Sequence, residues 1–152
     1  MTLPLHIART VFVSLEMLAI AICVFVWLVA PRLFEWLDTA MKNVDWLWLI
    51  SPFGVLGSTA LGLVWKILFP KDNVSDLISW PEYPKLRATA LVGVVFTLLG
   101  AVAASIGVLG RELLPTGLAS LLLTCGYAVS AISCFSMLTA ALVVRSIAAG
   151  GN

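Results

Sequence analysis

Four long apolar stretches dominate the pattern of hydrophobic and polar positions along the chain. They cover residues 10–30, 52–69, 88–110 and 117–144. Each of the first two contains one charged residue, and the last two contain none. A helix needs about 20 residues to cross a hydrocarbon core of about 30 Å, and it satisfies its own backbone hydrogen bonds in lipid. The pattern therefore predicts an all-α integral membrane protein whose single domain is a bundle of four transmembrane helices.

The segment between the first two stretches has a different pattern. Over residues 32–48, apolar side chains recur about every 3.6 positions among polar ones, which is typical of an amphipathic helix. Three tryptophans lie in this segment: Trp36, Trp46 and Trp48. Because tryptophan favours the level of the lipid head groups, we expect a helix in the membrane interface, or one packed on a partner protein or a second copy. Ser51 and Pro52 are typical of an N-cap and a first turn, so they predict the start of the second span.

The composition supports a lipid environment. Hydrophobic types make up 61% of the 152 residues and charged types 11%, whereas an ordinary soluble domain has about 25% charged residues. So few charges cannot cover the surface of a protein of this size in water. A soluble globular protein, a disordered tail and a nucleic-acid-binding module are therefore excluded. The formal net charge of +1 also gives no overall field that would steer a charged polymer or substrate.

The positive residues near the span ends predict the orientation in the membrane. Six lie near the N-terminus, the loop over residues 70–87 or the C-terminus: Arg9, Lys66, Lys71, Lys85, Arg87 and Arg145. Three lie on the other side: Arg32, Lys42 and Arg111. Lys and Arg accumulate on the cytoplasmic side of a membrane. We therefore expect the loop and both termini to be cytoplasmic, in a bacterial inner membrane.

Glu16 is the most informative single residue of the apolar stretches. A carboxylate inside a membrane span is costly and usually faces the bundle interior or water. Lys66 is expected at a similar depth, and Arg9 lies two helical turns before Glu16 on the same face, so both are candidate partners. This polar site could bind a proton or a cation, or line one side of a pore. The interpretation we favour is a paired carboxylate that fixes helix packing.

Small residues recur every four positions in three of the stretches, a spacing that lets helix backbones approach closely. The three candidate packing faces are Gly54, Ser58 and Gly62; Gly93, Thr97, Ala101 and Ser105; and Gly126, Ser130 and Cys134. Further hydroxyls in the fourth stretch could line a polar path, but such groups more often bond to their own helix or to a neighbour. Three faces exceed what one small bundle can use internally. We therefore expect self-association, docking to a larger protein, or both.

The residues that carry enzyme chemistry are scarce. The only histidine is His6, and the cysteines, Cys23, Cys125 and Cys134, form no CxxC motif. No metal or haem site and no Ser-His-Asp triad can be assembled from this set, and no glycine-rich phosphate loop follows a strand. The cysteines are best explained as small packing residues. We therefore expect a non-enzymatic protein without a cofactor.

The size and the four-span plan resemble those of small bacterial inner-membrane proteins: phage-exclusion and anti-phage defence proteins, immunity proteins against pore-forming toxins, and small subunits of secondary transporters. The resemblance is one of topology. The leading hypothesis is a membrane anchor, sensor or signal relay in a larger oligomeric assembly, with phage defence or exclusion as one setting. The alternatives are a homo-oligomeric, ion-conducting pore that depolarises the membrane, which ion flux in liposomes would distinguish, and an accessory transporter subunit.

Overall fold

The computed structural model describes residues 14–69 and 81–150. Within these residues the chain is helical and contains no strand. The helices are α2 (Leu15–Val29), α3 (Pro31–Lys42), α4 (Trp46–Leu68), α6 (Tyr83–Leu109) and α7 (Leu118–Gly150). Arg9, the start of the first predicted span and residues 70–80 of the predicted loop lie outside the described residues.

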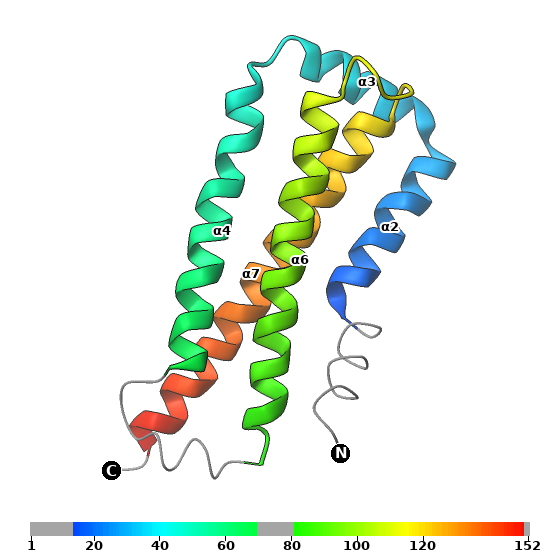
Figure 1. Ribbon diagram of the computed structural model, residues 1–152. Helices are drawn as coiled ribbons and strands as arrows, with labels where there is room; N and C mark the ends of the chain where they lie inside the picture. Colours follow the sequence, from blue (N-terminus) through cyan, green and yellow to red (C-terminus); the bar gives the residue numbers. More distant parts are fainter. Residues whose placement is uncertain (1–13, 70–80, 151–152) are drawn as a thin grey trace.

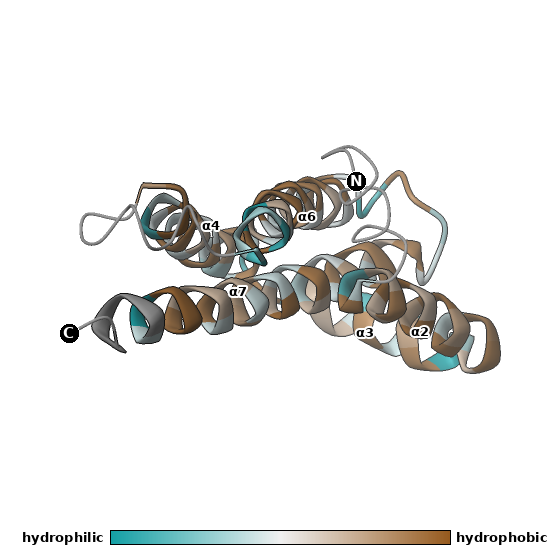
Figure 2. Ribbon diagram, turned by 90° about the horizontal axis from the view of Figure 1, so that it is seen from below, coloured by the Kyte–Doolittle hydropathy of each residue, from teal (hydrophilic) through white to brown (hydrophobic). Residues whose placement is uncertain are grey.

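The long helices form two layers. Helices α4 and α6 lie in one layer, and α7 and α2 lie in the other (Figures 1 and 2). Helix α7 crosses behind α6 obliquely, so that its ends approach different neighbours. It contacts α6 most extensively, and it also contacts α4, α2 and α3. Helix α3 lies across one end of the bundle, and the C-terminal end of α7 lies at the other (Figure 1).

Within the described parts of the chain, three helices are long and apolar enough to cross a membrane. They are α4, α6 and α7, the last over Leu118–Ser146. Helix α2 has 15 described residues, and a bend of 99° separates it from α3. At 1.5 Å per residue, the 33 residues of α7 extend for about 50 Å. This length exceeds the hydrocarbon core of about 30 Å, so a span formed by α7 would have to tilt or protrude from it.

The amphipathic segment predicted over residues 32–48 is two helices rather than one. Helix α3 ends at Lys42, and Asp45 is the N-cap of α4, where its Oδ1 accepts a hydrogen bond from the Leu47 N–H at 3.1 Å. Aspartate is favoured at the N-cap because its carboxylate accepts a hydrogen bond from a backbone N–H that has no acceptor within the helix. Trp46 and Trp48 therefore belong to the first turn of α4 and not to the same helix as Trp36.

The predicted start of the second span at Ser51 and Pro52 is wrong, because Pro52 lies inside α4. Proline has no N–H to donate to the carbonyl four residues earlier, which belongs to Trp48. The Ser51 hydroxyl lies 3.5 Å from that carbonyl oxygen and donates to it instead. The Ser-Pro pair thus lets the helix continue through the proline.

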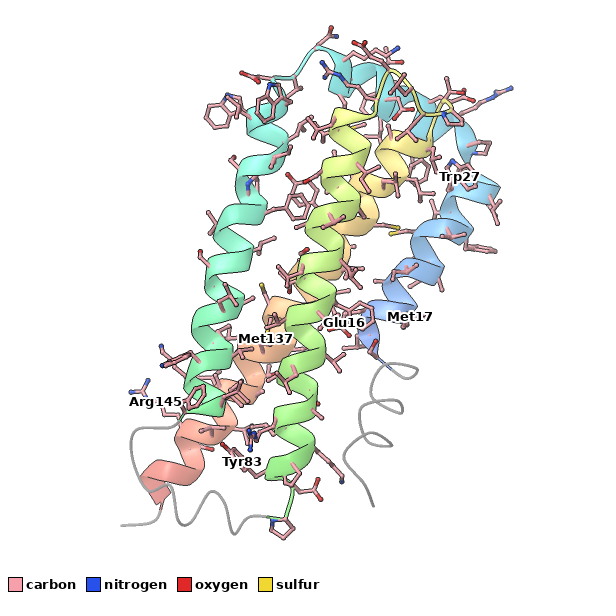
Figure 3. All side chains as sticks on the ribbon, in the orientation of Figure 1. Glu16, Met17, Trp27, Tyr83, Met137 and Arg145 are labelled. Atoms are coloured by element: carbon pink, nitrogen blue, oxygen red, sulfur yellow. The ribbon has the colours of Figure 1, made fainter. Side chains whose placement is uncertain are left out.

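The core lies chiefly between α6 and α7, where buried positions alternate in steps of four and three residues. On α7 they are Ala119, Leu123, Gly126, Ser130, Ser133, Met137, Ala140 and Val144. On α6 they are Gly93, Thr97, Gly100, Ala104 and Gly107. An average step of 3.5 residues keeps one face of each helix turned toward its neighbour over many turns. Met137 fills the space between the two helices (Figure 3).

Two tyrosines join helices through hydrogen bonds to backbone carbonyls. The Tyr83 hydroxyl donates to the Ile67 carbonyl at 3.0 Å, which ties the start of α6 to the last turn of α4. The Tyr127 hydroxyl donates to the Leu49 carbonyl, and its ring stacks on Phe53 with the ring centroids 4.4 Å apart. Helix α4 is therefore held against α6 at one end and against α7 near the other.

Candidate functional site

Glu16 lies in the first turn of α2 and points into the bundle. Ser14 caps this helix by accepting a hydrogen bond from the Met17 N–H at 3.3 Å. Figure 3 shows Glu16 on the side of α2 that faces α6 and α7, with Met17 on the outer side. The Glu16 side chain is only 5% exposed. Its position near the N-terminus of α2 favours a negative group through the helix dipole.

The partner of Glu16 is Ser133 of α7. The Ser133 hydroxyl donates to Glu16 Oε1 at 3.1 Å, and Ser133 itself is fully buried. A buried carboxylate is costly unless it has hydrogen-bond partners, and removing a partner raises that cost. This hydrogen bond therefore ties α2 to the middle of α7.

The three residues of the predicted polar site are not brought together. Lys66 is exposed in the last turn of α4, on the far side of the α6–α7 pair from α2 (Figure 1). Among residues 14–69 and 81–150 the only ion pair within 4.0 Å joins Lys85 to Glu82 at 2.6 Å, so Glu16 and Lys66 are not paired. The arrangement of the helices explains why Glu16 and Lys66 are apart, because α6 and α7 lie between α2 and α4. Arg9, the other predicted partner, lies outside the described residues.

Several hydroxyl groups of α6 and α7 donate hydrogen bonds to carbonyls of their own helix or of a neighbouring one. Thr97 donates to the Gly93 carbonyl at 2.8 Å, and Ser130 donates to the Thr97 carbonyl at 3.4 Å. In the part of the chain that the structure describes, every buried side-chain nitrogen or oxygen has a hydrogen-bond partner. The same part contains no group of three His, Cys, Asp or Glu side chains that could hold a metal ion.

The small residues of α6 and α7 pack closely against one another. A Cβ placed on Gly100 would lie 2.6 Å from the Ser130 hydroxyl oxygen and 2.8 Å from the Gly126 carbonyl oxygen. Gly126 and Ser130 of the predicted α7 face are buried, and Cys134 is half-buried, with its thiol donating to the Leu56 carbonyl of α4 at 3.3 Å. Only glycine lets the two backbones approach this closely.

The predicted face of α6 is buried at one end and turns away at the other. Gly93 and Thr97 are buried, whereas Ala101 and Ser105 are half-buried. A step of four residues turns a helix about 40° beyond a full rotation, so a strict four-residue series leaves the contact face. The buried series passes instead from Thr97 to Gly100.

Among residues 14–69 and 81–150, no side chain packs against the predicted small-residue face of α4. Gly54, Ser58 and Gly62 are all exposed, and a Cβ on either glycine would meet nothing within 4 Å. Ser58 donates to the Val55 carbonyl of its own helix at 3.0 Å. The side of α4 that packs in the bundle carries Phe53, Ala60, Val64 and Ile67. One small-residue face therefore remains open on the outside of the bundle.

No protein-family model, curated protein or solved structure matches this chain. The functional interpretation therefore comes from its own geometry.

Asp38, which was not among the predicted site residues, joins α3 to the start of α7. Both oxygens of Asp38 in α3 accept backbone hydrogen bonds at the start of α7, from the Gly117 N–H and from the Ser120 N–H, the latter at 2.8 Å. The Ser120 hydroxyl also donates to the Phe34 carbonyl at 2.8 Å. Gly117 has a φ of +83°, a backbone conformation that favours glycine. The isolated Gly117 before an apolar helix is the only sequence signal that could have indicated this junction.

Proposed function

We propose that the protein is a non-enzymatic, membrane-embedded component of a larger oligomeric assembly, in which it acts as an anchor, sensor or signal relay. It self-associates through the open face of α4 formed by Gly54, Ser58 and Gly62. It crosses a bacterial inner membrane four times, with both termini cytoplasmic and α3 in the outer interface. Phage defence or exclusion is one setting for such an assembly.

The open α4 face is the observation that carries this proposal. Lipid tails are as apolar as the side chains of a span, so helices in a membrane associate through close packing of small residues. The small residues of α6 and α7 are already in contact with each other, whereas those of α4 have open space beside them. A stripe on one helix is self-complementary in a symmetric pair, because each copy presents the same surface to the other. We therefore take a second copy of the chain as the occupant of this face.

The test is association in liposomes, measured by subunit photobleaching or energy transfer between labelled copies. For the double variant Gly54→Leu with Gly62→Leu, we expect an association constant at least about tenfold lower, because the branched side chains keep the backbones apart. The melting temperature should stay close to that of the wild type, since neither Cβ meets another atom. The matched control is Ala21→Leu, which adds bulk at an exposed position of α2.

Loss of association in the α4 variant alone would support this interface. Equal association of the wild type and the α4 variant, or a lone monomer in every case, would contradict it. Binding of a larger protein to the wild type but not to the α4 variant would mean that a partner protein, and not a second copy, occupies this face.

The two alternative functions have less support. A pore lined by Glu16 would require this side chain to leave its contact with Ser133, and Glu16 is 5% exposed in the single chain. An accessory role beside a transporter would use the same α4 face, with a permease as the occupant. A permease gene beside this one would favour that role, whereas a neighbouring soluble enzyme would favour an anchor or relay.

A further inference from the structure

A polar cleft lies at the α3 end of the bundle. It has a volume of about 680 Å³ and lies between α3 and the segment over residues 110–117 that joins α6 to α7. This volume falls within the range of about 300–1,000 Å³ that is typical of small-ligand sites. Charged side chains from both walls line it: Glu35 and Lys42 from α3, and Arg111 and Glu112 from the connecting segment. Met41 and Leu114 add apolar surface.

The two walls of the cleft are held together by hydrogen bonds. Asp38 binds the backbone amides of Gly117 and Ser120, as described above. The Arg111 guanidinium donates to the Met41 carbonyl at 3.3 Å. Both contacts join α3 to the opposite wall, so the cleft is formed by fixed elements before any ligand enters.

The charged groups of the cleft are available to a ligand. Glu35, Lys42 and Glu112 are exposed, and among the described residues none of the three forms an ion pair. The Arg111 guanidinium has five N–H donors, of which one is used for the Met41 carbonyl. Besides Asp38, whose carboxylate is already bonded to the Gly117 and Ser120 amides, the cleft thus presents two carboxylates and two cations. This arrangement suits a ligand that carries an ammonium group and a phosphate group, and it suits a purely anionic ligand less well.

The surroundings of the cleft place it beside lipid. Leu113, next to the lining residue Glu112, is 91% exposed. On α3, Trp36 is 66% exposed and Leu33 is 47% exposed. Large exposed apolar groups of this kind are typical of a membrane interface, where tryptophan lies at head-group level. A ligand with a charged head and an apolar tail would therefore find both of its environments here.

We propose that this cleft binds the zwitterionic head group of an ethanolamine phospholipid. The ammonium group contacts Glu35 and Glu112, and the phosphate contacts Lys42 and Arg111. A choline head group fits less well, because its quaternary nitrogen has no N–H to donate to the carboxylates. The site requires a membrane-embedded protein but does not depend on the α4 interface, so either proposal can fail without the other.

The experiment measures lipid binding to the full-length protein by native mass spectrometry in mild detergent. Ethanolamine, choline and glycerol phospholipids with identical acyl chains serve as probes. We expect the ethanolamine lipid to bind about tenfold more tightly than the choline lipid, as two charge-assisted hydrogen bonds allow. The double variant Glu35→Gln with Glu112→Gln should remove this preference. Lys42→Gln should weaken the binding of all three lipids.

The control is Glu82→Gln, which makes one substitution of the same kind at the other end of the bundle, where Glu82 pairs with Lys85. It should bind lipid as the wild type does. Equal binding of the three lipids by the wild type would overturn the proposal, as would an ethanolamine preference that survives in the double variant. If the double variant does not fold, loss of binding in Lys42→Gln alone supports the site, and unchanged binding in that variant overturns it.

Competition with soluble phosphoethanolamine shows whether the ligand is a phospholipid or a free phosphoamine with the same charged groups. Displacement of the lipid at millimolar concentration would mean that the cleft recognises the head group alone, so a free phosphoamine is also a ligand. A lack of displacement alongside the ethanolamine preference would mean that the acyl chains contribute, and the natural ligand is then the lipid.

Discussion

Replacing Gly126 with alanine is expected to destabilise the bundle by about 2–3 kcal/mol, the upper part of the range for overpacking a core. The added Cβ would collide with the Gly100 carbonyl oxygen and lie 2.9 Å from the Cβ of Ala104. These atoms belong to the backbone and first side-chain carbon of α6, so they cannot move aside without separating the two helices. Thermal unfolding in detergent, followed by circular dichroism, measures the change.

The matched control is Gly62→Ala on α4. A Cβ at Gly62 meets nothing within 4 Å. Alanine is a better helix former than glycine by up to about 1 kcal/mol, so this variant should be as stable as the wild type or slightly more stable. Equal stability of Gly126→Ala and Gly62→Ala would contradict the close contact between α6 and α7.

Asp38→Ala should lower the free energy of unfolding by about 2 kcal/mol, because it removes a charged acceptor from two backbone amides at the start of α7. Helix α3 should also be held less firmly to the bundle, with the Ser120–Phe34 and Arg111–Met41 hydrogen bonds remaining. Hydrogen exchange measured by mass spectrometry should therefore rise in α3 and in the first turn of α7. The rest of α7 should exchange as in the wild type.

The control for Asp38→Ala is Glu35→Ala, which removes a carboxylate from the preceding turn of the same helix. Glu35 is exposed, and its side chain forms no ion pair with any described residue. Its loss should change stability by less than about 0.5 kcal/mol. Similar effects of the two variants would mean that Asp38 does not hold the junction.

The sequence predicted a helix well where a single feature, such as a long stretch without charged residues, marked it clearly. The stretches over residues 88–110 and 117–144 contain no charged residue. Helix α6 begins before the first stretch, at Tyr83, and ends at Leu109, whereas α7 begins at Leu118 and continues beyond the second stretch to Gly150. The start of α4 could not be predicted in the same way, because both Asp45 and Ser51 are residues that favour an N-cap. Only the three-dimensional structure shows that α4 continues through Pro52, where the Ser51 hydroxyl donates a hydrogen bond to the carbonyl that the proline cannot reach.

The partners of polar residues were harder to predict than the polar residues themselves. Glu16 was identified as a site because a carboxylate is rare in an apolar stretch. Ser133 is one of several hydroxyl residues in its stretch, and nothing in its sequence context marks it as the partner. Lys66 was expected at a similar depth, but it lies on α4, which α6 and α7 separate from α2. Spacing along the chain does not determine which helices are neighbours.

The small-residue faces illustrate the same limit. Gly54, Ser58 and Gly62 have the same four-residue spacing as Gly93 and Thr97, yet one set is open and the other is buried. Spacing identifies a surface that can pack closely, and the order of the helices decides whether the same chain fills it. The open face of α4 is therefore a feature that only the assembled bundle distinguishes.

The placement of the two ends of the bundle on opposite faces of a membrane is the central claim, and cysteine labelling tests it most directly. In a background in which Cys23, Cys125 and Cys134 are replaced by serine, Glu112→Cys marks the α3 end and Glu82→Cys marks the opposite end. A membrane-impermeant maleimide applied to intact bacterial cells should label the first variant, and it should label the second only after the cells are lysed. Labelling of both variants in intact cells, or of Glu82→Cys alone, would contradict the account.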